Sequence, residues 1–220
     1  MNKITKTSFD SGWKNRGFTL VESIFVAIII ALGIAATYSF YQRVYAGKVA
    51  YEESQKTLEI TQRINRAYTA MGDFTDLSTT QVIRDGLVPS TMGVGDGTIE
   101  TTFGGSLVVQ PVEIGGVANG GFMLTHTNVA KKFCYKMVRA TNQLNRYASI
   151  HVSPYHGEGT IPDPDEISTV ATRGLIDENA LSEACGRAAN LNISFVQEKT
   201  QLAGTCGNSE LGFLLNKGDI

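Results

Sequence analysis

The feature that most constrains this chain is an apolar block near its N-terminus. Residues 18–41 form a run of 24 residues with one charged side chain, Glu22, and the central stretch IFVAIIIALGIAA has no charge at all. A helix rises about 1.5 Å per residue, so about 20 such residues cross the hydrocarbon core of a bilayer. The block therefore predicts a membrane-spanning helix.

The charges in front of this block predict its orientation. Residues 1–17 carry four basic side chains against one acidic side chain, a net charge of +3. The positive-inside rule keeps such a segment in the cytoplasm and sends the following body outward. The whole chain has a formal net charge of −2, which gives no support for nucleic-acid binding. We therefore expect a single-pass anchor with its N-terminus inside and an exported body.

Glu22 separates this block from an ordinary anchor. An ionisable group inside a bilayer costs roughly 3 kcal/mol or more unless it has a partner. If the chain is cut after Gly17, the new α-amino group of Phe18 lies four residues before Glu22, on the same helix face. The carboxylate can then neutralise the amine of its own chain or of a neighbour, and so fix the alignment in which chains polymerise. A secretory signal peptide has a shorter apolar region, and a plain anchor needs no carboxylate.

Residues 17–22, GFTLVE, resemble the prepilin motif of type IV pilins and of the pseudopilins of type II secretion. In that family a Gly precedes a hydrophobic residue, and Glu stands fifth in the mature chain, ahead of an apolar run. The resemblance implies that a prepilin peptidase cuts after Gly17 and methylates the new N-terminus, Phe18. It also implies that Glu22 pairs with the terminal amine of an adjacent subunit during assembly.

The rest of the chain most resembles type IVb pilins, including the PilS group of conjugative thin pili. The leader of 17 residues and the mature chain of 203 are both long for type IVa pilins. Residues 78–89, STTQVIRDGLVP, resemble the short helix and turn that follow the stem, and Cys134 on a helix with a late cysteine fits the same pattern. Phe18, where type IVb pilins often begin with Met or Leu, and a third cysteine depart from it.

Beyond the membrane block, the sequence predicts that the stem helix continues. Residues 43–71 contain no Pro, an apolar stripe with helical spacing runs through residues 60, 64, 67 and 71, and Gly72 and Asp73 end the helix. We expect four parts: a cleaved leader, 1–17; the transmembrane and polymerisation half of the stem, 18–42; its amphipathic half, 43–72; and a globular head, 73–220. The predicted fold class is α+β, with the stem packed on an antiparallel sheet.

Turn residues divide the head into short elements. Ser78 is expected to cap a short helix that ends at Gly86. Strands are expected at 107–112, 121–127, 147–153 and 192–197, with a turn at 115–120 between the first two. Helices are expected from Asn128 to about residue 141 and over 178–187, and a proline-containing loop over 154–165.

The three cysteines, Cys134, Cys185 and Cys206, all lie in the exported part. Their spacing contains no CxxC pair, and in an exported domain it predicts one disulfide and one remaining thiol. The spacing alone does not decide which cysteines pair. The type IVb resemblance favours Cys134 with Cys185, and Cys134 with Cys206 is the alternative.

No cluster of residues in the sequence predicts a metal, cofactor or catalytic site. His126, His151 and His156 have no carboxylate or thiol at a metal-ligand spacing and are expected to be surface or strand histidines. Residues 163–166, DPDE, lack the alternating ligands and the Gly of an EF-hand loop and are expected to form a solvated acidic loop. No Ser-His-Asp or Cys-His arrangement is recognisable, so we expect a chain that is not an enzyme.

The function implied by the resemblance is that of a structural subunit of a type IVb pilus, used for adhesion, aggregation or conjugation. Its implied partners are identical or related subunits, the prepilin peptidase, the inner-membrane assembly machinery and, before assembly, the lipid bilayer. The precursor is expected in the inner membrane and the assembled subunit outside the cell. A pseudopilin or minor pilin is the closest alternative, and a membrane-tethered enzyme is the alternative from another class.

Overall fold

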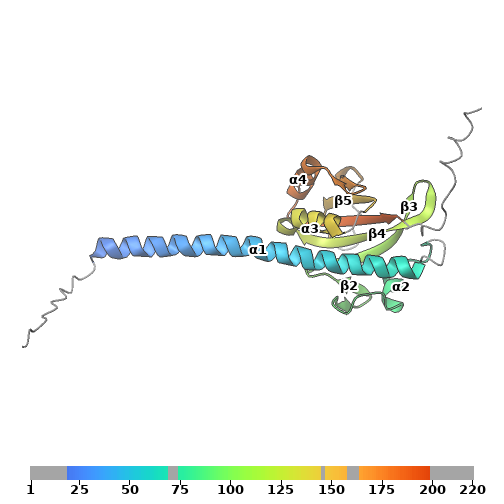
Figure 1. The fold of residues 1–220 in the computed structure, drawn as a ribbon, viewed down its shortest axis with the longest axis horizontal. Coiled ribbons are helices and arrows are strands. Elements are labelled where there is room, and N and C mark those ends of the chain that lie inside the picture. Colours follow the sequence, from blue (N-terminus) through green and yellow to red (C-terminus); the bar gives the residue numbers. More distant parts are fainter. Residues whose placement is uncertain (1–18, 69–73, 145–146, 158–163, 199–220) are drawn as a thin grey trace, which may run out of the picture. The chain divides into compact units, whose positions relative to one another are not determined.

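The computed structural model describes residues 19–68, 74–144, 147–157 and 164–198. Two compact units make up the chain, Met1–Val44 and Tyr45–Ile220, and the first helix contributes to both. The helices are α1 (Leu20–Tyr68), α2 (Thr79–Arg84), α3 (Lys131–Leu144) and α4 (Glu178–Gly186), with a single 3₁₀ turn at Pro164–Glu166 (Figure 1). The strands are β1 (Val94–Gly95), β2 (Thr98–Glu100), β3 (Ser106–Ile114), β4 (Val117–Ala130), β5 (Ser149–Pro154), β6 (Ser168–Thr172), β7 (Leu175–Ile176) and β8 (Asn190–Glu198).

Helix α1 is the long stem helix that the sequence predicts. Its 49 residues contain no Pro. Gly72 and Asp73, the predicted end of the helix, lie outside the described residues, which resume at Phe74. Ile60 and Ile64 are fully buried and Ala67 packs against the core, which confirms the predicted stripe for these three residues. Met71 lies outside the described residues.

The buried face of α1 begins earlier than the sequence indicates. It starts at Ala46 and continues at helical spacing through a series of small and polar side chains. Ser54, Thr57 and Thr61 each donate a hydrogen bond to the backbone carbonyl four residues earlier, at 2.7–2.8 Å. These hydroxyl groups donate within the helix, and each also contacts a polar group of the head; Ser54, for example, accepts the Thr141 hydroxyl at 2.8 Å. A hydropathy pattern does not reveal such a face.

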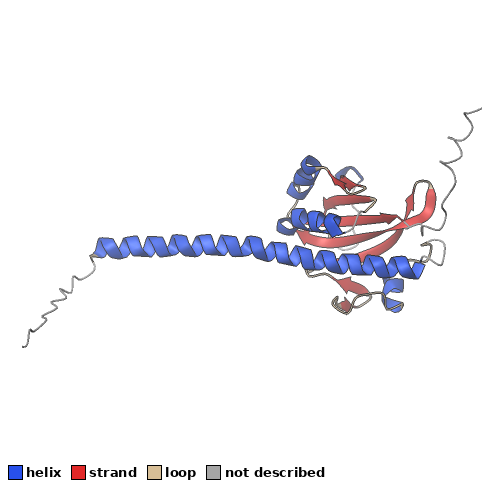
Figure 2. Cartoon of the chain, viewed as in Figure 1, coloured by secondary structure: helices blue, strands red, loops and turns tan. Residues whose placement is uncertain are grey.

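The head is an antiparallel sheet of eight strands in the order β1-β2-β3-β4-β8-β5-β6-β7. The last described strand, β8, lies in the middle of the sheet, between β4 and β5. Residues 190–198 therefore join strands β1–β4 to strands β5–β7. The part of α1 from Tyr45 onward packs with the other helices against this sheet (Figure 2). A long helix with an antiparallel sheet in the head confirms the predicted α+β fold class.

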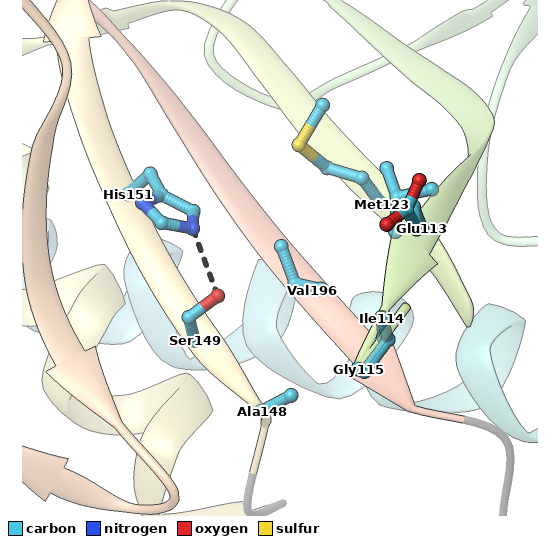
Figure 3. A pocket seen from close by; sticks show the side chains of 9 residues that line it. Glu113, Ile114, Gly115, Met123, Ala148, Ser149, His151 and Val196 are labelled. Carbon is cyan, nitrogen blue, oxygen red and sulfur yellow. Dashed lines mark hydrogen bonds between the residues drawn. The ribbon is translucent and has the colours of Figure 1, made fainter. Parts of the chain in front are cut away.

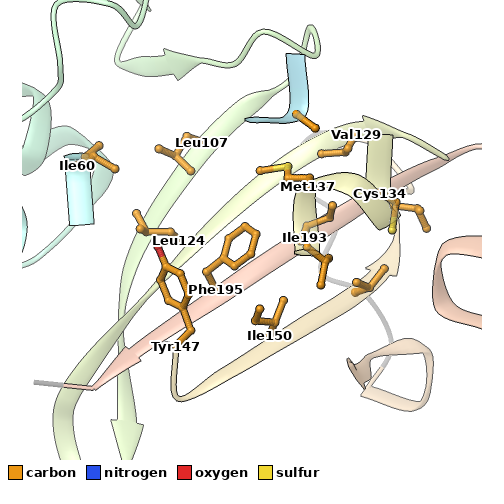
Figure 4. Packing of buried hydrophobic residues seen from close by; sticks show 14 of the residues in the cluster. Ile60, Leu107, Leu124, Val129, Cys134, Met137, Tyr147, Ile150, Ile193 and Phe195 are labelled. Atoms are coloured by element: carbon orange, nitrogen blue, oxygen red, sulfur yellow. The ribbon is translucent and has the colours of Figure 1, made fainter. Parts of the chain in front are cut away.

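The core lies between the sheet and these helices. Apolar residues from four neighbouring strands form one cross-strand row, Val109–Leu124–Phe195–Ile150, and each is at most 2% exposed. Figure 4 shows Leu124, Phe195 and Ile150 in one layer with Ile60 of α1 and Met137 of α3. A sheet covered by helices on one face buries alternate residues of a strand, and the first half of β3 shows this period-two pattern. β8, in the middle of the sheet, has buried residues on both of its faces.

The predicted short helix after the stem is confirmed as α2. Gln81 donates its backbone N–H to the Ser78 side chain at 3.2 Å, and Gly86 follows the C-cap with φ +66°. Thr79 then covers an edge of the sheet, because its hydroxyl accepts the backbone N–H of Val109 in β3 at 2.9 Å. That segment of β3 lies beyond its pairing with β2.

Two boundaries predicted in the head are wrong. Asn128 does not cap a helix; β4 continues to Ala130, and α3 starts at Lys131. Asn128 has φ +57° and sits at the register shift between His126 and Val129, because Asn tolerates the left-handed conformation that such a bulge requires.

The turn predicted over 115–120 is also wrong in length. The two residues between β3 and β4 are Gly115 and Gly116, with φ of 60° and 80°. Positive φ at both positions of a two-residue hairpin loop is the geometry that glycine favours.

Candidate processing and assembly site

The first turn of α1 contains the predicted assembly residue, Glu22. The helix begins at Leu20, directly after Thr19, whose side chain accepts the backbone N–H of Glu22 at 3.3 Å. Thr19 and Glu22 are three residues apart, the spacing of a capping box. The positive end of the helix dipole favours a carboxylate in this turn. Gly17 and Phe18, the predicted cleavage pair, lie outside the described residues.

The Thr19 cap was missed in the sequence analysis. Ser23 strengthens it, because its backbone N–H donates to the Thr19 carbonyl at 3.1 Å and its hydroxyl to the same oxygen at 3.3 Å. The signal was present in residues 19–22, TLVE, which match the Thr-x-x-Glu pattern. The first helical turn is therefore capped by Thr19, the second residue after the predicted cut.

The surface of α1 around and after Glu22 is apolar on all sides. Large side chains remain exposed all around this part of the helix, namely Leu20, Val21, Ile24, Phe25, Val26, Ile28, Ile29, Ile30, Leu32 and Ile34. A helix that is apolar all round is buried in a large core or spans a membrane. By length and composition, α1 is able to cross a bilayer.

A disulfide joins Cys134 to Cys185, with a sulfur–sulfur distance of 1.96 Å and a sequence separation of 51. This is the pairing that the resemblance favoured over Cys134 with Cys206, and Cys206 lies outside the described residues. The bridge ties α3 to α4, and Cys134 is fully buried.

Surface contacts reinforce the same pair of helices. Glu178, at the start of α4, accepts hydrogen bonds from the Tyr135 hydroxyl at 2.7 Å and from Arg139 at 2.5 Å. The hydrogen bond from Tyr135, assisted by Arg139, lowers the pKa of the Glu178 carboxyl. The link between α3 and α4 is therefore both covalent and polar.

A buried polar network links α1 to the sheet, and the sequence analysis did not anticipate it. Glu53 and His126 are both fully buried, and the His126 ring nitrogen Nδ1 lies 3.8 Å from Glu53 Oε1. His126 Nε2 lies 2.9 Å from the Thr57 hydroxyl. The other carboxylate oxygen of Glu53 accepts the Thr102 hydroxyl at 2.5 Å and Lys56 Nζ at 3.3 Å.

This network places a titratable ring in an apolar setting. Burial lowers the pKa of His126 from 6.5 to about 4; the Glu53 carboxylate opposes this shift and Lys56 adds to it. His126 was expected to be a surface or strand histidine, and it is a strand histidine on β4. Its neutral form is therefore the one that the folded head holds at neutral pH.

The other two histidines occupy separate parts of the head. His156 pairs with Glu166 at 2.8 Å, next to residues 158–163, which lie outside the described residues. His151 lies beside a groove of about 420 Å³, where Val196 and Met123 supply part of the lining (Figure 3). Burial lowers the pKa of His151.

The groove does not form a hydrolytic triad. His151 Nε2 lies 2.8 Å from the Ser149 hydroxyl, but Nδ1 contacts the Thr169 hydroxyl at 3.0 Å rather than a carboxylate. Glu113 lines the same groove from β3, and β4 and β8 separate it from His151 on β5. A triad needs an acid that orients the histidine, and Glu113 cannot fill that role here. Among the described residues, no three His, Cys, Asp or Glu side chains gather as metal ligands.

Two family models match the sequence. The model described as PilS N terminal matches residues 48–197, more than half of the chain. The model of the prokaryotic N-terminal methylation motif matches residues 14–38, which include the predicted cleavage pair and Glu22. No curated protein matches the sequence.

Solved structures that match this chain include two pilins. TcpA, a type IV pilin from Vibrio cholerae El Tor biotype, is 14% identical, with 69% of this chain and 99% of that chain covered and a TM-score of 0.49. The type IVb pilin from Salmonella typhi is 17% identical, with 66% of this chain and 98% of that chain covered and a TM-score of 0.44. The family assignment rests on the two sequence matches, and by them this chain belongs to the PilS family of type IV pilins, which are structural subunits and not enzymes.

Proposed function

We propose that this pilin is made as an inner-membrane precursor, cut between Gly17 and Phe18, methylated at Phe18 and polymerised with identical copies into a type IVb pilus. Residues 1–17 are the leader, and residues 18–42 are the transmembrane and polymerisation half of the stem. Residues 43–72 are the amphipathic half of the stem, and residues 73–220 form the globular head. The inner-membrane assembly machinery drives polymerisation. The filament serves adhesion, aggregation or conjugation.

The observation that carries this proposal is the position of Glu22 in a capped first helical turn, at the start of an apolar helix. Glu22 is the only charged side chain in residues 18–42. Cleavage would create an amine four residues before it, within reach of the same carboxylate. Once stems pack together and exclude water, each amine needs a carboxylate, and the pairing fixes one register.

The proposed cut is tested by replacing Gly17 in the full precursor. The Gly17→Leu variant is expected to remain uncut, because the peptidase must approach the backbone closely at this residue. Gly12→Leu is the matched control, since it changes the other glycine of the leader and should be processed normally. Intact-mass measurement of both proteins, expressed with the peptidase, distinguishes the two outcomes; equal maturation of both variants would refute the proposed site.

A further inference from the structure

The apolar surface of α1 ends in a short aromatic segment. We call it the tyrosine collar, and it comprises Tyr38, Phe40, Tyr41 and Tyr45. The exposed fractions of these side chains are 64%, 70%, 59% and 46%. Residues 19–37, in contrast, contain no Tyr or Trp. Aromatic side chains with a polar tip thus begin where the surface of aliphatic side chains and Phe25 stops.

The collar does not form a single stripe. At about 100° per residue, Tyr38, Tyr41 and Tyr45 lie within about 60° of one another, and Phe40 lies on the opposite side of the helix. A stripe that docks on one partner helix would leave the opposite side polar. Tyrosine has an apolar ring and a polar tip, and it is enriched at the level of lipid headgroups.

The charges at the two ends of the span agree with this assignment. After Glu22, the next charged residue is Arg43, which falls within the collar. The helix between Glu22 and Tyr41 rises about 29 Å, and the hydrocarbon core of a bilayer is about 30 Å thick. The uncharged segment therefore has the length of the core, with a titratable or aromatic group at each boundary.

We propose that, in the membrane-held precursor, the tyrosine collar lies in the outer headgroup layer of the bilayer and Glu22 lies at the opposite headgroup layer, outside the hydrocarbon core. This inference rests on the proposed function, because it assumes that the precursor spans a membrane. Its partner is the lipid headgroup layer. The tyrosine hydroxyls contact headgroups and water, while their rings and Phe40 pack against the upper acyl chains.

This placement determines when the charge of Glu22 is desolvated. At the inner headgroup layer the carboxylate reaches water, and Thr19 keeps the first helical turn ordered there. Insertion of the precursor then costs little, since the large penalty applies only at the bilayer centre. The carboxylate loses its water when stems pack into a filament, which is the step at which a partner amine is needed.

The depth of each segment is tested by tryptophan fluorescence in the full precursor. Trp13 is the only Trp of the chain, so Trp13→Phe gives a silent background. Single probes are then introduced as Val21→Trp, Ile30→Trp and Tyr41→Trp. Vesicles of phosphatidylcholine and phosphatidylglycerol carry bromine either near the headgroup or near the end of the acyl chain.

We expect the probes at 21 and 41 to be quenched roughly twofold more by the shallow than by the deep label, and the probe at 30 to show the reverse. If the probe at 21 or at 41 were quenched more by the deep label than by the shallow one, the placement would be wrong. Shielding of the probe at 41 from both lipid labels and from acrylamide in water would also overturn it, because that result indicates packing against another copy.

These samples and the Gly17 processing assay together separate this inference from the proposed function. If all three probes are quenched by acrylamide and none by lipid, the chain does not span the bilayer and both fail. If the chain is cut after Gly17 but the depths are wrong, only the inference on the tyrosine collar fails.

Discussion

His126 is a basic group held in an apolar interior, and its burial decides how the head responds to acid. Its ring edge meets Phe195 at a centroid distance of 5.9 Å, and Glu53 and Lys56 are the charged groups that face it from α1. The uncharged hydroxyl of Thr57 lies within hydrogen-bond distance of His126 Nε2. The folded head therefore favours the neutral ring, whereas an unfolded chain protonates it near pH 6.5.

The sign of the resulting pH dependence follows from this difference. Because the pKa of His126 falls from 6.5 in the unfolded chain to about 4 in the folded one, its contribution to stability is complete above pH 6.5 and is lost as the pH falls towards 4. The expected loss of unfolding free energy is about 3 kcal/mol. Urea unfolding of the mature chain in detergent at pH 7 and pH 4 measures it.

The control for this prediction is His126→Gln, which keeps a polar side chain but does not titrate. Acid should destabilise this variant less than the parent chain, since the remaining loss comes only from other groups. An equal acid-induced loss in both proteins would show that His126 is not the group responsible.

Glu22 is the residue on which the proposed alignment of subunits depends. Glu22→Ala should leave a processed subunit that adds to filaments roughly a hundredfold more weakly, because the packed amine loses its counter-charge at a cost of about 3 kcal/mol. The effect is measured as the ratio of subunit in filaments sheared from cells to subunit that remains bound to the cells. Glu52→Ala is the matched control, since Glu52 is a half-exposed carboxylate of the same helix, 3.5 Å from Lys48. Normal filament yield from Glu22→Ala would show that Glu22 does not fix the alignment of the subunits.

At the scale of elements, the predictable parts are those in which local chemistry decides the structure. The stem follows from length, the absence of Pro and the stripe at Ile60 and Ile64. Helix α2 follows from the Ser78 cap and the left-handed Gly86, and α4 from a polar segment that begins after Asp177, whose side chain accepts two backbone N–H groups.

The elements that sequence reasoning missed are set by contacts distant in the chain. Strands β1, β2, β6 and β7 have two to five residues each and are held by pairing with neighbours. Residues 168–172, STVAT, contain no long apolar alternation, and β6 forms because β5 offers it a paired edge. The Glu53–His126 contact, which joins residues far apart in sequence, has no local signature either.

The disulfide between α3 and α4 acts at this scale, since it closes a long loop of the head. In the chain-entropy model, a loop of this length gives a stabilisation of about 4 kcal/mol. The double variant Cys134→Ser/Cys185→Ser should therefore unfold at a lower urea concentration by that free energy, with α4 the first part to be cut by protease. Cys206→Ser is the control and should unfold as the parent chain does. Equal stability of the double variant and the parent would mean that the bridge does not stabilise the folded head.

The whole molecule combines a long stem helix, apolar in its first half, with a head whose sequence matches the PilS family. Under the proposed function, the stem supplies the membrane span and the alignment of subunits, and the head supplies the surface of the filament. The disulfide and the sheet hold the head together. Each proposed function then has its own part of the chain, and we expect the junction at residues 17–22 to control the change from membrane protein to polymer.

The most direct test of the central claim is the identity of the first residue of the mature subunit. Filaments are sheared from cells, the subunit is isolated, and its N-terminal peptide is analysed by mass spectrometry. We predict N-methylphenylalanine from Phe18, followed by TLVES. A subunit that retains residues 1–17, or that begins at any residue other than Phe18, would contradict the account.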